Sequence, residues 1–331
     1  MNAISSILRR CENNQRLNII TFSGHERFEP NLCRVNADFY SLNGPNVKPW
    51  NTKFSKIPEN YFFVTELKPH INFDCIISHN PFSHIQLGSP LSKQLHIPII
   101  NIFHTDSPGS WSQQTKQQNQ GFFDQCAHHV FISEYNKISW SFSDDKNTSV
   151  ITHGIDSELF KPLDIERENV ILSVANDYAG RNFELGFDIW RAITQNLPVK
   201  VIGNTLGLSK PAESLEELVG EYQKSQIFLN TSLRSPMPMS LIEGAACGNA
   251  ILTTNTNAIC DFFTHGYDAL IFSPNDLQQG RAYLEKLLKD KHLCKKLGEN
   301  ARRTILEKFK ISDFVDKWEG LLRTVCGKVY K

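Results

Sequence analysis

The chain has 331 residues, of which 40% are hydrophobic and 21% charged, as in a soluble globular protein of about two domains. Its 35 Lys and Arg balance its 35 Asp and Glu, which excludes a global field that would attract nucleic acid or an anionic membrane. The eight cysteines show no CxxC spacing, and neither a signal peptide nor a membrane-spanning run is visible. These features indicate a cytoplasmic protein with reduced thiols.

Short apolar runs, each followed by a turn and a helical pattern, recur in the first half of the chain. The runs are continuous rather than alternating, which is typical of parallel strands covered on both faces. They predict strands at residues 17–22, 73–79, 97–103 and 127–133. Because strands and helices alternate, residues 1–150 are predicted to form a Rossmann-like domain with a parallel sheet.

A second series of the same kind follows, and the boundary is expected near residues 150–165. Two α/β, Rossmann-like domains in tandem predict sheets that face each other across a cleft, with ligands at the carboxyl ends of the strands. The last segment, 311–331, is predicted as a helix that crosses back to the first domain. The expected strands are 170–176, 199–203, 225–230, 250–254 and 269–274; the expected helices are 183–196, 215–222, 239–247 and two polar-faced helices beginning at Asp276.

The segment SPMPMSLIEGAACGNAIL, residues 235–252, is the most informative of the chain. Two prolines, the second of which is Pro238, stiffen a loop. A helix is expected to start near Met239, with Ser240 and Leu241 in its first turn. The amino end of a helix attracts phosphate through its N–H groups and its dipole. Glu243, one turn later, can then accept hydrogen bonds from ribose hydroxyls. A capped and packed helix with Glu243 as a surface carboxylate explains the spacing equally well.

Residues 235–274 resemble the donor-binding segment of GT-B glycosyltransferases of the GT4, or group 1, family. That family carries two glutamates separated by seven residues, the first near the transferred sugar and the second on the nucleotide ribose. Glu243 stands at the second position, and Ser235 stands where the first glutamate is usual. The resemblance implies a GT-B fold and a nucleotide diphosphate sugar as donor, with an altered donor sugar or altered chemistry because of Ser235.

Three further segments, residues 150–162, 171–193 and 199–207, resemble the interdomain, diphosphate and nucleobase segments of the same family. In the diphosphate segment, the usual lysine falls at Leu185, so that cation is absent. Arg181 is the nearest replacement, since a guanidinium can bind a diphosphate through two hydrogen bonds. A solvent-exposed loop cation is the alternative interpretation of Arg181.

Polar residues also follow the predicted strands of the first half. Gly24 permits a tight turn after the first strand and places His25 at the ligand-binding edge. His104 and Asp106 follow a later strand and are candidates for acceptor contacts or proton transfer. A histidine at a strand end is also often structural. His79, at the end of another predicted strand, is a weaker candidate for the site than His104.

The resemblance implies a retaining hexosyl- or pentosyltransferase that moves a sugar from a nucleotide diphosphate sugar, with UDP favoured, to a hydroxyl of a glycan or another acceptor. The His and Cys residues show no metal-ligand spacing and no Asp-x-Asp motif is present, so a metal-independent reaction without a cofactor is expected. The predicted catalytic residues are His104, Asp106, Arg181 and Ser235; the predicted donor-binding residues are Gly24, His25, Arg181, Pro238, Met239, Ser240, Leu241 and Glu243.

Other functions stay open on the sequence. A DNA acceptor carrying hydroxymethylcytosine would need a flipped base and a basic groove, which Lys48, Lys53, Lys56 and Trp50 could line. Because Ser235 and Leu185 replace usual family residues, an inactive nucleotide-sugar-binding protein is another alternative, as is a sugar-nucleotide epimerase. Nothing in the sequence indicates the oligomeric state.

Overall fold

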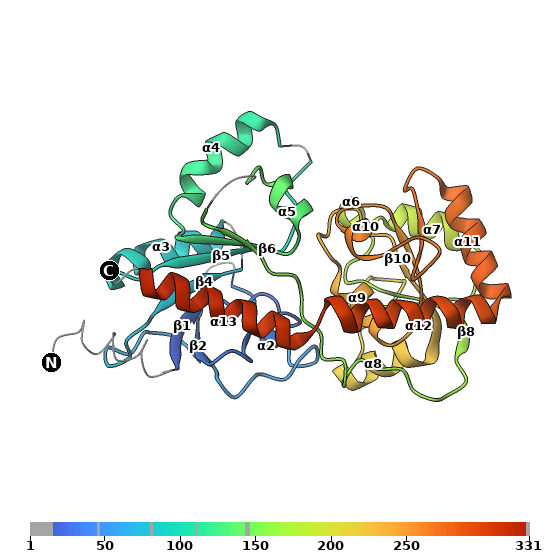
Figure 1. The fold of residues 1–331 in the computed structure, drawn as a ribbon, viewed down its shortest axis with the longest axis horizontal. Coiled ribbons are helices and arrows are strands. Elements are labelled where there is room, and N and C mark those ends of the chain that lie inside the picture. The colour runs from blue at the N-terminus through green and yellow to red at the C-terminus, as the bar shows by residue number, and fades with distance from the viewer. Residues whose placement is uncertain (1–15, 45–46, 80–81, 110, 143–145, 329–331) are drawn as a thin grey trace. The chain divides into compact units, whose positions relative to one another are not determined.

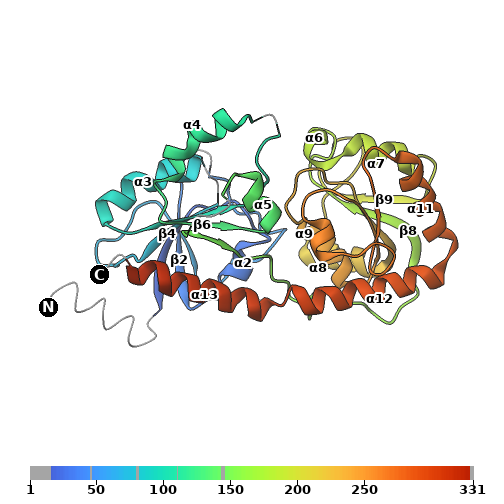
Figure 2. The ribbon, with the colours of Figure 1, turned by 45° about the horizontal axis from the view of Figure 1, so that its top comes forward.

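The computed structural model describes residues 16–44, 47–79, 82–109, 111–142 and 146–328. The chain divides into two compact units, one formed by residues 1–152 and 312–331 and the other by residues 153–311. Each unit holds one sheet in which all neighbouring strands are parallel, with helices packed around it (Figures 1 and 2). The predicted α/β class with two Rossmann-like units is confirmed.

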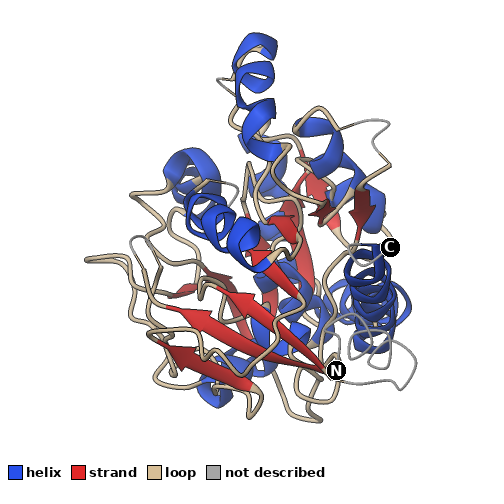
Figure 3. Cartoon of the chain, turned by 90° about the vertical axis from the view of Figure 1, so that its left-hand side faces the viewer, coloured by secondary structure: helices blue, strands red, loops and turns tan. Residues whose placement is uncertain are grey.

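The first unit is built on a seven-stranded sheet in the order β3-β2-β1-β4-β5-β6-β7. Figure 3 draws the strands of the chain in red. Its inner strands are the continuous apolar runs that the sequence predicts, and β4 and β5 are buried throughout. The strands are β1 (Leu17–Thr21), β2 (Ala37–Leu42), β3 (Tyr61–Val64), β4 (Cys75–Ser78), β5 (Ile99–Phe103), β6 (His128–Phe131) and β7 (Thr148–Val150). The helices are α2 (Glu29–Leu32), α3 (Ser83–Leu95), α4 (Gln113–Phe123), α5 (Glu134–Ser139) and α13 (Ile311–Lys328).

Three strands of this sheet, β2, β3 and β7, are not predicted by the sequence pattern. They lie at or next to the edges of the sheet, where one face or one side of a strand meets solvent. In β2 buried and half-buried residues alternate, and in β3 Phe62 and Phe63 are exposed. The alternation in β2 hides this strand from a search for continuous apolar runs, whereas β3 is a short apolar run, YFFV, that the prediction leaves out.

The C-terminal helix α13 belongs to the first unit although it follows the second unit in the sequence. Its Phe314 and Trp318 rings are buried and lie edge-on to Phe28 at centroid distances of 5.5 and 6.4 Å. Glu319 accepts a hydrogen bond from the backbone N–H of Asn36. The first unit is thus completed by a segment from the opposite end of the chain.

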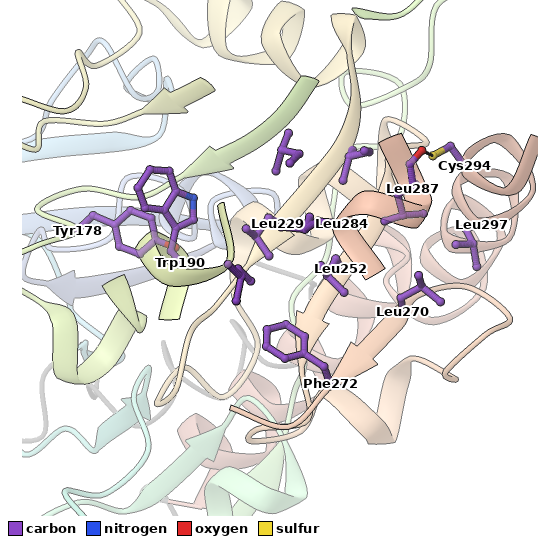
Figure 4. Close-up of a cluster of buried hydrophobic side chains, with 14 residues drawn as sticks. Tyr178, Trp190, Leu229, Leu252, Leu270, Phe272, Leu284, Leu287, Cys294 and Leu297 are labelled. Atoms are coloured by element: carbon purple, nitrogen blue, oxygen red, sulfur yellow. Dashed lines mark hydrogen bonds between the residues drawn. The ribbon is translucent and has the colours of Figure 1, made fainter. Parts of the chain in front are cut away.

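The second unit is built on a five-stranded sheet in the order β12-β11-β10-β8-β9. One apolar cluster packs helices against this sheet and includes Trp190, Leu229, Leu252, Phe272 and Leu284 (Figure 4). The strands are β8 (Glu168–Val174), β9 (Val199–Ile202), β10 (Ser225–Asn230), β11 (Ala250–Thr254) and β12 (Leu270–Phe272). The helices are α6 (Asn182–Leu185), α7 (Phe187–Thr194), α8 (Leu215–Lys224), α9 (Met239–Ala246), α10 (Ile259–Phe262), α11 (Leu277–Lys289) and α12 (Lys291–Lys308).

The prediction of a single helix over 183–196 is wrong, because the chain breaks into α6 and α7 at Gly186. This glycine has a φ of +69°, which a continuous helix does not allow. A Cβ atom at this position would clash with the carbonyl oxygen of Thr231. The break therefore lets the loop after β10 approach the backbone closely, as only a glycine permits.

Candidate functional site

A cavity of about 250 Å³ opens within the second unit at the carboxyl ends of β8 and β10. Ligands of parallel α/β sheets bind at this edge. The lining comes from the ends of two strands, the α6 region and the start of α9. The lining residues are Ser173, Val174, Ala175, Asn176, Tyr178, Arg181, Leu185, Leu229, Asn230, Thr231, Ser232, Ser235, Pro238, Met239 and Ser240.

The amino end of α9 forms one wall of this cavity. Pro238 is its N-cap residue and supplies no side-chain cap to the first turn, and Met239 and Ser240 line the cavity. The first backbone N–H groups of a helix have no carbonyl partner within the helix, so a wall of this kind favours an anion. Ser235, which precedes this helix, also lines the cavity.

The small residues of α9 serve packing against the sheet. A Cβ atom on Gly244 would lie 2.9 Å from Cγ of Phe228 in β10. Leu241 is fully buried, and its backbone N–H donates to the carbonyl of Pro238. The side chain of Leu241 is therefore part of the core of this unit and not of the cavity wall.

Glu243 lies inside the protein with only 2% of its surface exposed, so the alternative of a surface carboxylate is wrong. Its Oε2 accepts a hydrogen bond of 2.9 Å from the hydroxyl of Tyr222 on α8. Glu243 is not among the residues that line the cavity. Its predicted contact with ribose stays a prediction, and such a contact would have to form beside the bond to Tyr222.

Arg181 lines the cavity and is engaged in an ion pair. Its Nη2 lies 2.6 Å and its Nε 2.8 Å from Oε2 of Glu184, in the first turn after it. The side chain is 47% exposed, so solvent screens this pair. The charge that Arg181 offers to an anion is therefore partly compensated by its own neighbour.

The loop after β9 meets the loop after β8, part of which lines the cavity. Gly203, at the end of β9, has a φ of +151°, and a Cβ atom there would clash with the carbonyl oxygen of Ala175. The hydroxyl of Thr205 accepts a hydrogen bond of 2.7 Å from the backbone N–H of Tyr178. Gly203 is therefore needed for the close approach of these loops.

Tyr178 and Thr231 belong to the cavity but are not predicted from the sequence. Their hydroxyl groups lie 2.5 Å apart, and the Thr231 hydroxyl donates to the carbonyl of Leu185. Both residues follow strand ends, at β8 and β10, and this position is the signal that could have identified them.

A second cluster of polar residues lies in the first unit, at the carboxyl ends of β1, β4 and β5. The His25 and His104 rings are stacked at a centroid distance of 3.9 Å, and Nε2 of His104 lies 3.1 Å from Nδ1 of His79. The backbone N–H of Gly24 donates to the carboxyl group of Glu29. The structure thus brings together predicted residues of two separate sequence segments.

Asp106 is bound by a residue outside the group of stacked histidines. It is buried, and its Oδ1 accepts a hydrogen bond of 2.9 Å from the side-chain amide of Asn136. The same amide also donates to the carbonyl of Thr105. These contacts hold the loop after β5 in place, so they give Asp106 a structural task in addition to the predicted one.

The lysines considered for a basic groove, Lys48, Lys53 and Lys56, are exposed. Trp50 packs against Tyr61 at a centroid distance of 4.9 Å, and its indole N–H donates to the carbonyl of Ser55. The Trp50 ring is thus engaged in the fold of its own loop.

Within the described ranges, no group of three His, Cys, Asp or Glu residues is arranged to hold a metal ion. The helices in that part of the chain are all too short or too polar to cross a bilayer. Five of the described cysteines, Cys33, Cys75, Cys247, Cys294 and Cys326, are buried free thiols, as the sequence predicts.

Comparisons with known proteins agree with this geometry. Residues 209–304 match the family model of glycosyl transferases group 1. An uncharacterized glycosyltransferase of Methanocaldococcus jannaschii is 22% identical over 326 residues, which cover 86% of this chain and 81% of the relative. The 2-deoxystreptamine N-acetyl-D-glucosaminyltransferase of Niallia circulans is 32% identical over 85 residues, 26% of this chain and 22% of that protein.

Solved structures share the fold at low sequence identity. Anabaena HepE in complex with UDP and glucose superposes with a TM-score of 0.71 at 14% identity, covering 92% of this chain and 98% of that one. Sucrose-phosphate synthase of Thermosynechococcus elongatus gives a TM-score of 0.68 at 12% identity, covering 95% and 100%.

Two parallel-sheet units with a cavity at the strand ends of the second define the GT-B class of fold, as the sequence predicts. Residues 209–304 are similar to glycosyl transferases group 1, and the chain is a glycosyltransferase of the GT-B fold. The predicted family resemblance and the predicted enzyme class are confirmed.

Proposed function

We propose that the protein is a GT4-type enzyme that transfers a hexose or pentose from a UDP-sugar to an acceptor hydroxyl, with retention and without a metal ion. The second unit, with the motifs of residues 151–310, is proposed as the donor-binding unit, and the first as the acceptor-binding unit. The support for UDP is that the similar Anabaena protein carries UDP and glucose in its structure. The support for the site is the position of the cavity at the amino end of α9.

The single observation that carries the proposal is this cavity wall, since it offers backbone N–H groups where a diphosphate would lie. Negative charge builds on the diphosphate as the glycosidic bond breaks, and fixed donors stabilise it without reorganisation. Met239 and Ser240 are proposed to act through these backbone groups. Arg181 is proposed to add a cation, in competition with Glu184.

Ser235 and Glu243 are assigned different tasks. Ser235 lines the cavity and is proposed to face the sugar, where a hydroxyl replaces the usual carboxylate. Glu243 is proposed to orient the ribose from its buried position. His104 and Asp106 are proposed to bind the acceptor and to receive its proton, and Gly24 and His25 are proposed to bind the donor.

A panel of nucleotides and nucleotide sugars tests the donor. A ligand that binds only the folded state stabilises it, by about 2.7 kcal/mol at a concentration of 100 times Kd. The melting temperature rises as a result. We expect UDP and a UDP-sugar to raise the melting temperature and GDP to leave it unchanged. If no nucleotide diphosphate shifts the transition, the proposed donor site is wrong.

Turnover is tested separately, because Ser235 also fits an inactive nucleotide-sugar-binding protein. An active enzyme should slowly release UDP from its UDP-sugar even without acceptor, and EDTA should leave this release unchanged. Binding without release favours the inactive protein, and conversion of the sugar without release favours an epimerase. The variant Ser235→Glu should change the preferred sugar if position 235 faces it.

Hydroxymethylated duplex DNA is the alternative acceptor. Binding through the exposed Lys48, Lys53 and Lys56 would fall with rising salt, with a slope of about −0.9 for each phosphate neutralised. We expect no salt-dependent binding of such DNA and no transfer to it, because the chain as a whole is neutral. A steep slope together with transfer would identify DNA as the acceptor.

A further inference from the structure

A buried carboxylate that has no task in the proposed reaction lies behind the stacked histidines of the first unit. Glu29, in α2, is only 1% exposed. Burial raises the pKa of its carboxyl group, and hydrogen bonds from His25, Tyr61 and Gly24 lower this pKa in part. A carboxylate is costly to bury unless it is well bonded, so its contacts indicate what it is for.

Both oxygens of Glu29 accept hydrogen bonds. Oε2 accepts from the backbone N–H of Gly24 at 3.1 Å and from that of His25 at 2.8 Å. Oε1 accepts from the hydroxyl of Tyr61 at 2.7 Å. The loop after β1 is therefore fixed by Glu29, and with it the ring of His25 that stacks on His104.

Glu29 also faces His79, which in turn contacts His104. Oε1 of Glu29 lies 3.7 Å from Nε2 of His79, and Nδ1 of His79 lies 3.1 Å from Nε2 of His104. Burial lowers the pKa of His79 to about 3, so its ring is neutral at pH 7 and carries one proton. A carboxyl oxygen opposite Nε2 favours that proton on Nε2, because a lone pair there would face another lone pair.

The proton of His104 follows from this arrangement. If His79 carries its proton on Nε2, its Nδ1 is an acceptor, and the contact of 3.1 Å requires a proton on Nε2 of His104. Neutral His104 then has its basic lone pair on Nδ1. Phe28, edge-on to the His104 ring at 4.8 Å, restricts rotation of the ring.

We propose that Glu29 is a positioning residue for His25 and His104: it holds His25 through the backbone and fixes, through His79, the ring nitrogen on which His104 carries its proton. The inference rests on the proposed function only in giving His104 a task at the acceptor. It adds that Nδ1 of His104 is the atom that would receive the acceptor proton.

The variant Glu29→Gln makes the proposal testable without knowledge of the acceptor. The backbone N–H groups of Gly24 and His25 need an acceptor, so the amide oxygen of the variant takes the place of Oε2. Its NH₂ group then takes the place of Oε1, 3.7 Å from Nε2 of His79, and N–H groups opposite that nitrogen favour a lone pair on it. The proton of His79 should move to Nδ1, and that of His104 should move from Nε2 to Nδ1.

Nitrogen-15 NMR of the full chain with labelled histidine reads these tautomers directly, with signals assigned by the variants His79→Gln and His104→Gln. We expect Nε2–H forms of both rings in the natural protein and Nδ1–H forms in Glu29→Gln. Asp74→Asn is the matched control, since this buried carboxylate accepts a backbone N–H of Asn18 at 2.8 Å, before β4. It should leave both tautomers unchanged.

The natural protein alone can overturn the proposal, even if Glu29→Gln does not fold. A His104 ring that carries its proton on Nδ1 in the natural protein contradicts it, as do unchanged tautomers in a folded Glu29→Gln variant. In the UDP-release assay water takes the place of the acceptor and its proton would pass to Nδ1 of His104, so Glu29→Gln should lower UDP release about 10-fold or more and leave the UDP-induced melting shift unchanged. A protein that binds no UDP contradicts the proposed function, and the tautomers still decide the role of Glu29.

Discussion

At the scale of single residues, the carboxylates of this protein are explained by their partners. Glu243 is buried against the Tyr222 hydroxyl, and Glu184 compensates Arg181. A buried charge that loses its partner is costly, whereas an exposed pair contributes little. Removing the charge of Glu243 and removing that of Glu184 should therefore have different effects on the protein.

Glu243→Gln keeps the size of the side chain and removes its charge. If Glu243 binds ribose, the affinity for UDP should fall about 10- to 100-fold, because hydrogen bonds to charged groups contribute about 1.5–3 kcal/mol. Tyr222→Phe is the control: it should lower stability by about 1–3 kcal/mol and leave UDP affinity unchanged. Calorimetric titration with UDP measures the affinity of each variant. Equal affinities of the two variants would remove Glu243 from the ribose site.

Glu184→Gln should release Arg181 from its ion pair and strengthen the binding of UDP. The pair is half-exposed, so the gain is limited to about 1.4- to 5-fold, from about 0.2–1 kcal/mol. Uridine, which has no phosphate, should bind equally to both proteins. Asp188→Asn, which breaks the similar pair with Arg191 at 3.0 Å outside the cavity lining, should change neither affinity. A gain for uridine would contradict a role of Arg181 at the diphosphate.

At the scale of elements, the sequence predicts what a local pattern encodes. Continuous apolar runs reveal the inner strands, and prolines followed by small residues reveal the start of α9. The outer strands β2 and β7 lack such runs, because they are partly exposed, whereas β3 is a short apolar run, YFFV, that the prediction leaves out. Tyr178 and Thr231 follow strand ends, which marks them as candidates, but their mutual contact depends on a close approach of loops distant in sequence, which no local pattern encodes. The site is thus predictable along α9, whereas its contacts across the strand ends are not.

Gly186 is the position where one element depends on another. In Gly186→Ala, the positive φ and the contact of the new Cβ with Thr231 should together cost about 2–5 kcal/mol of unfolding free energy. Gly207 also has a positive φ, of +74°, but a Cβ atom there would meet no other described atom within 4 Å, so Gly207→Ala should cost about 1 kcal/mol. Denaturant unfolding of both variants measures the difference, and equal losses would show that the contact with Thr231 is relieved.

At the scale of the whole molecule, chain order and unit composition do not coincide. The first unit needs α13, which follows the second unit in the chain, whereas the second unit is continuous from 153 to 311. Trp318 is fully buried and Phe314 nearly so, and both belong to the core of the first unit. The first unit can complete its packing only after the second has been synthesised.

Trp318→Ala should therefore destabilise the first unit and leave the stability of the second unit unchanged. Truncation of a buried tryptophan costs about 3–5 kcal/mol, and this loss should fall on the first unit. Hydrogen exchange should become faster in β1, β4 and β5 and stay unchanged in β8, β10 and β11, and UDP should still protect the loops after β8 and β10. The reverse is expected for Trp190→Ala, in the core of the second unit. If Trp318→Ala abolishes protection by UDP, the donor site depends on the first unit, and its assignment to residues 153–311 alone is wrong.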